Sequence, residues 1–312
     1  MSLFDLKNKK VLVTGGAGFI GSHIVDKLLA NNCQVVVIDN LSSGDLKNLQ
    51  DNNNLKFYKL DIVNDDLELV FEIEQPDFVI HLAAQTSVAY SVTNPIEDAN
   101  RNILGSIKVL ELSKKYNVKK IIAASSAAVY GNPQYLPIDE NHPTIPMSPY
   151  GLSKLTMEKY IKLSGVPYVI FRFSNAYGPR QQSSKESGVI AIFNDAMLNN
   201  KPINIYGDGE QLRDFIYVED IAQVCIETLK SDIQSEIFNF STNKGVTINQ
   251  VFDEMKQVYG YELDANYLPE RDGEIRDSVL SNSNISSSVC IQTLGLKEGV
   301  LRLNHKIKTC FE

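Results

Sequence analysis

A tyrosine and a lysine carry the clearest chemical signal in this sequence. Tyr150 and Lys154 are four residues apart, and the Ser148-Pro149 pair before them is typical of a helix start. Residues at positions i and i+4 share one helix face, so the lysine ammonium would lie beside the phenol. A free phenol has a pKa of about 10, and a nearby positive charge stabilises the phenolate and lowers that value. The pair therefore predicts a tyrosine that serves as a base near neutral pH.

A serine on an upstream strand would complete this group. The segment A-A-S-S-A-A-V-Y-G, residues 123–131, follows an apolar run and places Ser126 where a strand should end. The carboxyl ends of parallel strands form the edge at which open α/β sheets bind ligands. Y-x-x-x-K alone occurs often by chance, but hydroxyl, tyrosine and lysine in this order are more specific. We expect Ser126 to hold a substrate oxygen and to pass protons to Tyr150.

A glycine-rich turn near the N-terminus predicts a phosphate-binding site. The segment G-G-A-G-F-I-G, residues 15–21, follows the apolar run 10–14 and opens a segment with helical spacing. Gly15 and Gly18 would let the backbone approach a pyrophosphate, and Gly21 would let the helix pack close to the strand. The N–H groups at the helix start would then face the anion. A tight glycine turn without a ligand is the alternative.

The end of the second apolar run carries an acid. Asp39 follows Gly21 by about 18 residues, close to the spacing of the acid that binds the adenosine ribose of NAD. A carboxylate there repels the phosphate of NADP, and none of the next ten residues is an arginine. Asp61 and Ile62, after the third run, are candidates to frame the adenine. The sequence therefore predicts NAD as the cofactor, with a solvated strand end as the alternative for Asp39.

Short apolar runs alternate with segments of helical spacing through the first half of the chain. The runs span residues 10–14, 34–39, 56–60, 77–81, 119–125 and 167–173. Several are apolar almost throughout, as strands covered on both faces are. One helix face would be formed by Ile96, Ala99, Ile103, Ile107 and Leu110. This alternation predicts a doubly wound, parallel α/β sheet.

Composition and charge exclude several classes of protein. The 312 residues suffice for about two domains, and 43% hydrophobic and 22% charged residues are typical of a globular protein. A net charge of −8 argues against general binding to nucleic acid or to anionic membranes. The chain shows no apolar run of membrane-spanning length, no signal-peptide pattern and four widely separated cysteines, so we expect a cytoplasmic protein. The four histidines show no metal-ligand spacing, so we expect no metal.

Taken together, these motifs resemble the extended short-chain dehydrogenase/reductase family, and within it the UDP-glucose 4-epimerase-like enzymes of nucleotide sugars. The resemblance runs from about residue 9 to residue 299. It rests on residues 14–21, 39–44, 81–85, 125–131, 150–154, 172–181, 207–220 and 271–278. It implies a Rossmann-type, mostly parallel seven-stranded sheet and a smaller, interleaved α/β substrate domain. The implied boundaries are 1–178 for the NAD domain, with a return near 215–245, and 179–214 and 246–312 for the substrate domain.

The resemblance also implies which residues hold each ligand. For NAD they are Gly15, Gly18, Phe19, Ile20, Gly21, Asp39, Asn40, Ser42, Gly44, Asp61, Ile62, Leu82, Ala83, Ala84, Gln85, Asn102, Ser125, Tyr150, Lys154 and Phe173. For the nucleotide sugar they are Ser87, Ser126, Tyr150, Asn175, Val189, Asn204, Tyr206, Arg213, Arg271 and Ser278. Asn175 matches an asparagine that contacts the diphosphate or sugar, and Arg213 and Arg271 match two arginines that clamp the diphosphate. Surface ion pairs with the adjacent aspartates are the alternative for both arginines.

The implied reaction is epimerisation at C4 of a UDP-hexose. Tyr150 would take the proton of the 4-hydroxyl while C4 gives a hydride to NAD⁺, and a transient 4-keto sugar would be reduced on its other face. Ser278 stands where a bulky tyrosine would narrow the site, so UDP-N-acetylglucosamine should also fit unless other walls set the size.

Related reactions on the same fold have to be weighed against epimerisation. The family's 4,6-dehydratases carry an Asp-Glu pair after the active-site hydroxyl, where this chain has Ala127 and Ala128, so epimerisation is favoured over dehydration. Nucleotide-sugar decarboxylases and uronate epimerases need only NAD, tyrosine and lysine for their first step, and these motifs suit them equally. A non-catalytic NAD-binding protein of this fold would usually lack the tyrosine or the lysine, and this chain keeps both.

A homodimer is implied by the same resemblance. Related enzymes often pair through the helices that correspond to residues 95–117 and 149–164. Leu155, Ile103 and Leu110 would then be contact residues, although the same apolar side chains would suit the core of a single chain. We expect a nucleotide-sugar substrate and no nucleic-acid or membrane partner.

Overall fold

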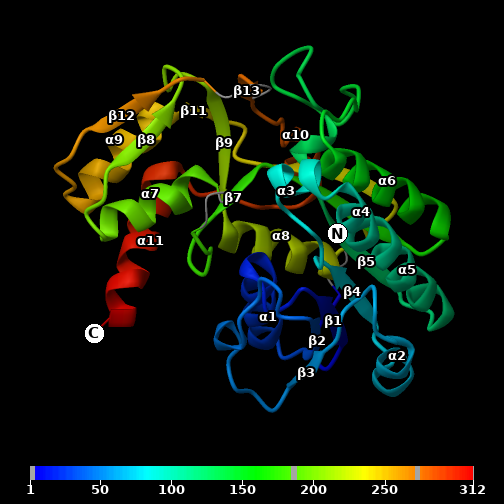
Figure 1. Cartoon of the computed structure of the whole chain (residues 1–312). Helices are drawn as coiled ribbons and strands as arrows, with labels where there is room; N and C mark the ends of the chain where they lie inside the picture. The colour runs from blue at the N-terminus through cyan, green and yellow to red at the C-terminus, as the bar shows by residue number, and fades with distance from the viewer. Residues whose placement is uncertain (1–3, 184–187, 271–274, 312) are drawn as a thin grey trace.

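The computed structural model describes residues 4–183, 188–270 and 275–311, the last helix beyond residue 305 by its backbone only. Its large sheet consists of β1 (Lys10–Thr14), β2 (Gln34–Asp39), β3 (Leu55–Lys59), β4 (Phe78–His81), β5 (Lys120–Ser126), β6 (Tyr168–Phe173) and β10 (Glu236–Phe240). The strand order is β10-β6-β5-β4-β1-β2-β3, and every adjacent pair is parallel. Figure 1 labels β1 to β5 of this sheet. The predicted parallel seven-stranded sheet is confirmed, and each predicted run matches a strand to within one residue. The strand order reverses between β1 and β4, where sheets of this kind bind ligands.

Helices cover both faces of this sheet. The helices α1 (Phe19–Ala30) and α8 (Val218–Lys230) pack on one face, and α2 (Glu68–Glu74), α5 (Gly105–Lys115) and α6 (Pro149–Ser164) pack on the other. Alternate residues of one strand enter the two cores: Val11 and Val13 join the first, and Leu12 joins the second. The central strands are therefore buried on both faces, which explains why their sequences are apolar throughout.

The helical segment from residue 88 to residue 115 is divided into shorter helices, which the sequence does not predict. It consists of α3 (Val88–Thr93), α4 (Pro95–Ala99), a π-helical turn (Asn100–Leu104) and α5. The predicted apolar face is wrong in its first half, because Ile96 is 77% exposed and Ile103 and Ile107 are half-buried. Asp98 and Asn102 point inward instead and are buried. Hydrogen bonds satisfy these polar side chains, so the helix can turn a polar face toward the protein.

Two of the predicted dimer contacts are corrected by the structure. Leu110 and Leu155 are buried among other side chains of the same chain, Leu110 on the inner face of α5 and Leu155 beside Val129 and Tyr130. They therefore belong to the core of the single chain. Only Ile103, which is half-buried, keeps some accessible surface.

The second half of the chain adds smaller sheets beside the large one. They are formed by β7 (Asn175–Tyr177), β8 (Ile203–Tyr206), β9 (Leu212–Tyr217), β11 (Gly245–Thr247), β12 (Ala265–Leu268) and β13 (Asp277–Ser278). Strand β9 pairs with β7, β11 and β13, while β8 pairs with β12. The helices here are α7 (Val189–Leu198), α9 (Ile248–Tyr259), α10 (Ser283–Ser288) and α11 (Leu296–Phe311). A separate core, which includes Phe193, Val251 and Val300, holds β8, β9 and three of these helices together.

Two further observations concern the described residues as a whole. None of their helices combines the length and the apolar character needed to cross a membrane. They also contain no group of three or more histidine, cysteine, aspartate or glutamate side chains placed to hold a metal ion.

Candidate active site

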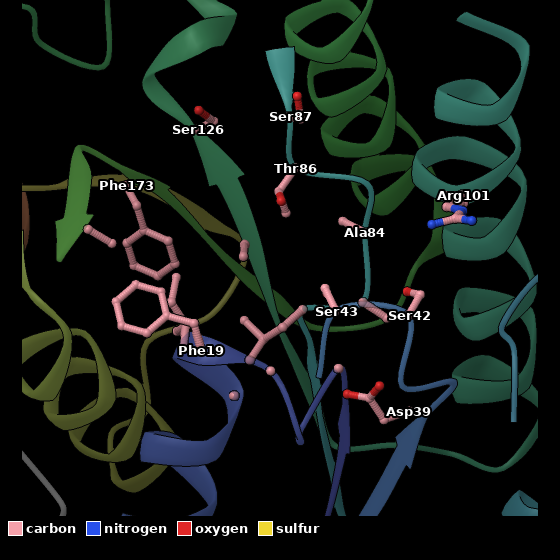
Figure 2. Close-up of a pocket in the computed structure, with 18 of the residues that line it drawn as sticks. Phe19, Asp39, Ser42, Ser43, Ala84, Thr86, Ser87, Arg101, Ser126 and Phe173 are labelled. Atoms are coloured by element: carbon pink, nitrogen blue, oxygen red, sulfur yellow. The ribbon is translucent and has the colours of Figure 1, made fainter. Parts of the chain in front are cut away.

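A cavity of about 500 Å³ opens at the carboxyl edge of the large sheet, where the strand order reverses (Figure 2). Phe19 and Phe173 lie on one side of it and Arg101 on the other. The predicted cofactor residues that line it are Gly15, Gly18, Phe19, Ile20, Gly21, Asp39, Asn40, Ser42, Asp61, Ile62, Leu82, Ala83, Ala84, Ser125, Tyr150, Lys154 and Phe173. The predicted substrate residues Ser87 and Ser126 also line it. Residues from most of the predicted motifs thus meet in one place.

The glycine turn between β1 and α1 lies very close to neighbouring backbone atoms. Gly15 has a φ of +71°, and a Cβ there would lie 2.8 Å from the backbone nitrogen of Ala83. A Cβ on Gly21 would lie 2.1 Å from the carbonyl oxygen of Gly15, so the helix could not start so near the strand with any other residue. No side chain caps α1 at Gly18, and no acid lies in its first turn. The positive end of this helix therefore suits a pyrophosphate.

Carboxylates stand at the ends of β2 and β3. Asp39 accepts the backbone N–H of Ala17 at 3.0 Å, which fixes it beside the glycine turn. Asn40 Nδ2 donates to Asp61 Oδ2 at 2.6 Å. Burial acts to raise the pKa of Asp61, but hydrogen bonds from Asn40 and from the backbone hold it below its ordinary value. The carboxylate oxygens can accept hydrogen bonds from ribose hydroxyls and from an adenine amino group, so these residues and the glycine turn fit NAD.

Helix α6 brings the tyrosine to the end of β5. The Ser148 hydroxyl caps this helix by accepting the N–H of Gly151 at 3.1 Å. A Cβ on Gly151 would lie 2.5 Å from the carbonyl oxygen of Ala128. The absence of a side chain at Gly151 therefore lets α6 pack directly on the 3₁₀ turn Ala127–Val129, which follows Ser126. This packing sets the spacing between Ser126 and Tyr150.

The side chains of Ser126 and Tyr150 lie beside each other in the lining of the cavity. The Ser126 oxygen also accepts the N–H of Ala128 at 3.2 Å, so the serine proton can be given to the tyrosine oxygen or to a ligand. Burial raises the pKa of Tyr150, and the neighbouring Ser126 hydroxyl opposes that rise. The pair can therefore relay a proton between a ligand hydroxyl and the tyrosine.

Lys154 lies one helical turn beyond Tyr150 and is buried. Its Nζ donates to the carbonyl oxygen of Ala124 at 3.0 Å and lies 6.0 Å from the centre of the Tyr150 ring. Burial lowers the pKa of Lys154 to about 8, while Asp98 and Glu158 act to raise it. An ammonium at this distance stabilises the phenolate form of Tyr150 and counters the effect of burial.

Three predicted cofactor residues support the cavity from behind its wall. Gln85 and Asn102 exchange two hydrogen bonds: the Gln85 N–H donates to Asn102 Oδ1 at 2.8 Å, and Asn102 Nδ2 donates to the Gln85 carbonyl at 3.0 Å. This exchange ties the loop after β4 to the π-helical turn. A Cβ on Gly44 would lie 3.1 Å from Asp39 Oδ1, so Gly44 gives the loop after β2 room beside that carboxylate.

Most of the predicted substrate residues lie outside the cavity lining. They are Asn175, Val189, Asn204, Tyr206, Arg213 and Ser278. Three of them gather on one sheet, because Arg213 is the register partner of Ser278 and Asn175 is the partner of Phe215, two residues along β9. The Arg213 guanidinium donates to the carbonyl oxygens of Leu212 and Arg276 at 2.9 and 3.0 Å. Arg271 lies outside the described residues.

Other lining residues were not expected from the sequence. They are Ile38, Ser43, Leu60, Thr86, Arg101, Ala124, Ser174, Ala176, Arg180, Gln181, Gln182 and Gly188. Arg180 forms an ion pair with Asp26 of α1 at 2.8 Å, and Gln182 Nε2 donates to the Ser43 carbonyl at 3.2 Å. These contacts draw the segment after β7 across to the loop after β2. Arg180 and Gln181 belong to the motif 172–181 that supports the family resemblance, so the sequence could have indicated them as lining residues. No motif in the sequence includes Arg101.

The site combines a parallel sheet, a glycine turn, an acid at the end of β2 and a Ser–Tyr–Lys group in one cavity. This combination defines a nicotinamide-dependent enzyme of the Rossmann type. The model of the NAD dependent epimerase/dehydratase family matches residues 11–240. The chain belongs to this family and depends on NAD, as the sequence predicts.

Solved structures of similar proteins agree with this assignment. The UDP-glucose 4-epimerase of Thermotoga maritima, solved with UDP-glucose, is 41% identical, with a TM-score of 0.92 over 97% of this chain and 100% of that chain. The UDP-N-acetylglucosamine 4-epimerase of Methanobrevibacter ruminantium, solved with UDP-N-acetylmuramic acid, is 39% identical, with a TM-score of 0.91 over 97% and 99% of the two chains. The UDP-glucose 4-epimerase of Thermus thermophilus, solved with NAD, is 36% identical, with a TM-score of 0.88 over 94% and 97%.

Proposed function

We propose that this protein interconverts the C4 epimers of UDP-hexoses. The observation that carries the proposal is that Ser126, Tyr150 and Lys154 line the same cavity as the glycine turn, with Lys154 Nζ 6.0 Å from the centre of the Tyr150 ring. A hydroxyl of a bound sugar at this place would meet a base and a proton relay together. The similar enzymes from Thermotoga and Thermus, named as UDP-glucose 4-epimerases, support the choice of reaction.

The residues of the chain would divide the proton chemistry among them. Ser126 holds the oxygen on C4 of the sugar, and Tyr150 removes its proton and later returns it. Lys154 keeps the tyrosine ready to act as a base, because its positive charge stabilises the phenolate. The glycine turn, Asp39 and Asp61 would hold NAD, which when bound would supply the hydride acceptor and donor. The sugar must present both faces of C4 in turn, so the diphosphate would stay bound while the sugar rotates.

The diphosphate and the sugar would be held by the sheet around β9. Arg213 and Ser278 are neighbours on that sheet, and Asn175 lies close by. Guanidinium is a bidentate partner for phosphate oxygens, which suits Arg213. Ser278 is small and leaves space where a larger side chain would crowd an N-acetyl group. We therefore propose that UDP-N-acetylglucosamine is a substrate as well as UDP-glucose, and the similarly named Methanobrevibacter enzyme supports this.

The acids of the cavity argue against a 4,6-dehydratase. Among the described lining residues, the carboxylates are Asp39 and Asp61, both at the adenosine end. Ala127 and Ala128 follow Ser126 in the 3₁₀ turn, where an elimination of water would need an acid and a base. Oxidation and reduction at C4 need only the Ser–Tyr–Lys group and NAD. The observed side chains therefore favour epimerisation over elimination.

We also propose that the protein forms a homodimer. Helices α4 and α6 pack on each other and expose Ile96, Leu152 and Leu163, which are large apolar side chains. A second copy that covered these helices would remove the apolar surface from water. Light scattering at micromolar concentration should give twice the mass of the chain, and a monomeric mass would contradict the proposal.

Product analysis tests the proposed reaction. The purified protein is incubated with UDP-glucose or with UDP-N-acetylglucosamine, without added NAD, and the sugars are followed by proton NMR. We expect the 4-epimer of both substrates, and we expect Tyr150→Phe to lower the rate by at least about 10²-fold because the base is lost. Tyr150→Phe with normal turnover would contradict the mechanism. If neither sugar reacts even with added NAD, the reaction is wrong, and dTDP-glucose and UDP-glucuronate are the next substrates to incubate.

A further inference from the structure

His81, at the end of β4, is a buried titratable side chain that the proposed proton chemistry does not use. It is only 2% exposed. Its Nδ1 lies 2.7 Å from the hydroxyl oxygen of Thr14, the last residue of β1, and its Nε2 lies 2.9 Å from the hydroxyl oxygen of Ser106, at the start of α5. Both ring nitrogens are thus within hydrogen-bond distance of a hydroxyl, and the direction of each bond decides which nitrogen carries the proton.

The Thr14 hydroxyl has to donate to His81. Its oxygen already accepts the backbone N–H groups of Leu82 and Ala83, both at 3.2 Å. A hydroxyl has one proton to donate and two lone pairs with which to accept. Among the described residues, Nδ1 of His81 is the acceptor that remains for that proton. Nδ1 therefore carries no proton, and a neutral ring carries its proton on Nε2.

The Ser106 side of the ring agrees with this tautomer. The Ser106 hydroxyl donates to the carbonyl oxygen of Asn102 at 2.7 Å, so its oxygen can accept Nε2–H. The protons of the chain from Thr14 through His81 and Ser106 to Asn102 therefore all point the same way. Burial lowers the pKa of His81 to about 3, and the charge of Lys154 acts in the same direction, so the ring is neutral at pH 7.

The two ends of this hydrogen-bonded chain hold different parts of the cavity lining. At one end, Thr14 fixes the N–H groups of Leu82 and Ala83, and both of these residues line the cavity. At the other end, Asn102 belongs to the π-helical turn, from which Arg101 lines the cavity (Figure 2). The imidazole ring spans the space between the loop after β4 and that turn.

We propose that His81, as the neutral Nε2–H tautomer, is a positioning residue for the NAD site. Its two directional hydrogen bonds fix the loop after β4 and the π-helical turn relative to each other, and the lining residues on both would contact the cofactor. The ring itself lies behind the described lining of the cavity. The proposal requires the NAD site of the family but not the proposed epimerisation.

The tautomer can be measured directly. The holoenzyme is prepared with ¹⁵N-labelled histidine, and two-dimensional NMR spectra correlate both ring nitrogens with the ring carbon protons from about pH 5 to about pH 8. His81→Gln identifies the resonances; if that variant does not fold, replacing each of the other histidines in turn identifies them by elimination. We expect a proton on Nε2 and none on Nδ1 throughout. A proton on Nδ1, or a ring that becomes charged in this range, would overturn the proposal.

Ser106→Ala tests the connection to the cofactor, and Ser113→Ala is its matched control. Both serines are buried on α5, and each donates to the carbonyl oxygen four residues earlier at 2.7 Å. Of the two, Ser106 is the one that contacts His81. Both variants lose the same contact within the helix, whereas Ser106→Ala also leaves Nε2–H without its partner. A buried donor that loses its partner is costly, so the ring and the turn should shift in Ser106→Ala alone.

Exchange of bound NAD gives the readout. Each holoenzyme is mixed with an excess of ¹⁴C-labelled NAD, and the label bound to the protein is followed by rapid gel filtration. We expect Ser106→Ala to exchange its NAD about tenfold faster than the parent, and Ser113→Ala to stay within about twofold of it. Equal exchange rates in the two variants would overturn the role of His81 in the NAD site.

Thr14→Val examines the same chain from its other end, should Ser106→Ala fail to fold. It removes the proton that Nδ1 accepts while keeping the shape of the side chain, and we expect the same faster exchange of NAD. An exchange rate equal to that of the parent would overturn the proposal. Both the tautomer and the exchange are measured without a sugar, so a failure of the proposed epimerisation would leave these results unchanged.

Discussion

Gly151→Ala should disturb catalysis more than it disturbs stability. The new Cβ would lie 2.5 Å from the carbonyl oxygen of Ala128 and 3.0 Å from the Cβ of Pro146. Ordinary contact begins at 3.4 Å, so the start of α6 must move away from the 3₁₀ turn by up to about 0.9 Å. Tyr150 moves with α6, and Ser126 stays with β5. The Ser126 and Tyr150 hydroxyls are therefore moved apart.

The size of the effect follows from that displacement. A misplacement of about 1 Å in a reacting group can cost about 10²-fold in rate. Crowding of one methyl group in a packed place costs about 1–3 kcal/mol of unfolding free energy. We therefore expect kcat for UDP-glucose to fall by about 10²-fold while the protein stays folded and keeps its NAD. Initial rates by NMR and calorimetric unfolding measure the two effects.

Gly165→Ala at the other end of α6 is the control. Gly165 has a φ of +77°, and no atom lies within 4 Å of an added Cβ. Alanine there costs about 1 kcal/mol of backbone strain but touches nothing in the site. We expect a lower melting temperature and a kcat within about twofold of the parent. A Gly151→Ala variant with a comparably unchanged kcat would refute the idea that packing of α6 on Ala128 positions Tyr150.

Three other features of the structure lead to predictions of their own. Glu158→Gln leaves Arg172 buried beside a neutral group, so urea unfolding should show a loss of about 3–5 kcal/mol, and a loss below about 1 kcal/mol would count against the buried pair. Ser278→Tyr should lower kcat/KM for UDP-N-acetylglucosamine at least about tenfold relative to kcat/KM for UDP-glucose. An unchanged ratio of the two kcat/KM values would show that Ser278 does not decide whether an N-acetyl group fits. Burial acts to raise the pKa of Glu74, but its lysine and tyrosine donors lower it to about 2 from 4.5. Because the folded pKa is the lower one, Glu74 adds stability above pH 4.5 that is lost between pH 4.5 and 2, and this acid loss should shrink in Glu74→Gln.

The strands were predictable because their physical situation is simple. Each central strand is covered on both faces, so Val11, Leu12 and Val13 are all apolar although they enter different cores. The glycine turn was predictable for a related reason. Backbone atoms lie so close to Gly15 and Gly21 that neither position can hold a side chain, and the two glycines are visible in the sequence.

The helices beside the site were harder to predict because their buried faces are polar. Hydrophobic spacing pointed to Ile96 as an inward residue, yet Asp98 and Asn102 occupy that side. Their burial depends on partners in the loop after β4, among them Gln85, which is distant in sequence. Hydrophobic periodicity takes no account of hydrogen bonds between separate segments, so it predicted the wrong buried face for this helix.

The substrate side was predicted only as a set of residues and not as an arrangement. Arg213 and Ser278 become neighbours through the pairing of β9 with β13, two strands that lie about 60 residues apart in the sequence. Arg101 lines the cavity from a π-helical turn, and no residue pattern in the chain predicts that turn. Long-range pairing and local helix defects are both decided by tertiary packing.

Retention of a label at C4 tests the central claim most directly. UDP-glucose that carries deuterium on C4 is incubated with the purified enzyme in ordinary water, without added NAD. The account predicts UDP-galactose that keeps the deuterium at C4, because the hydrogen leaves and returns as a hydride that does not exchange with water. Product with hydrogen from the solvent at C4 would show that this hydrogen leaves carbon as a proton, and would contradict the account.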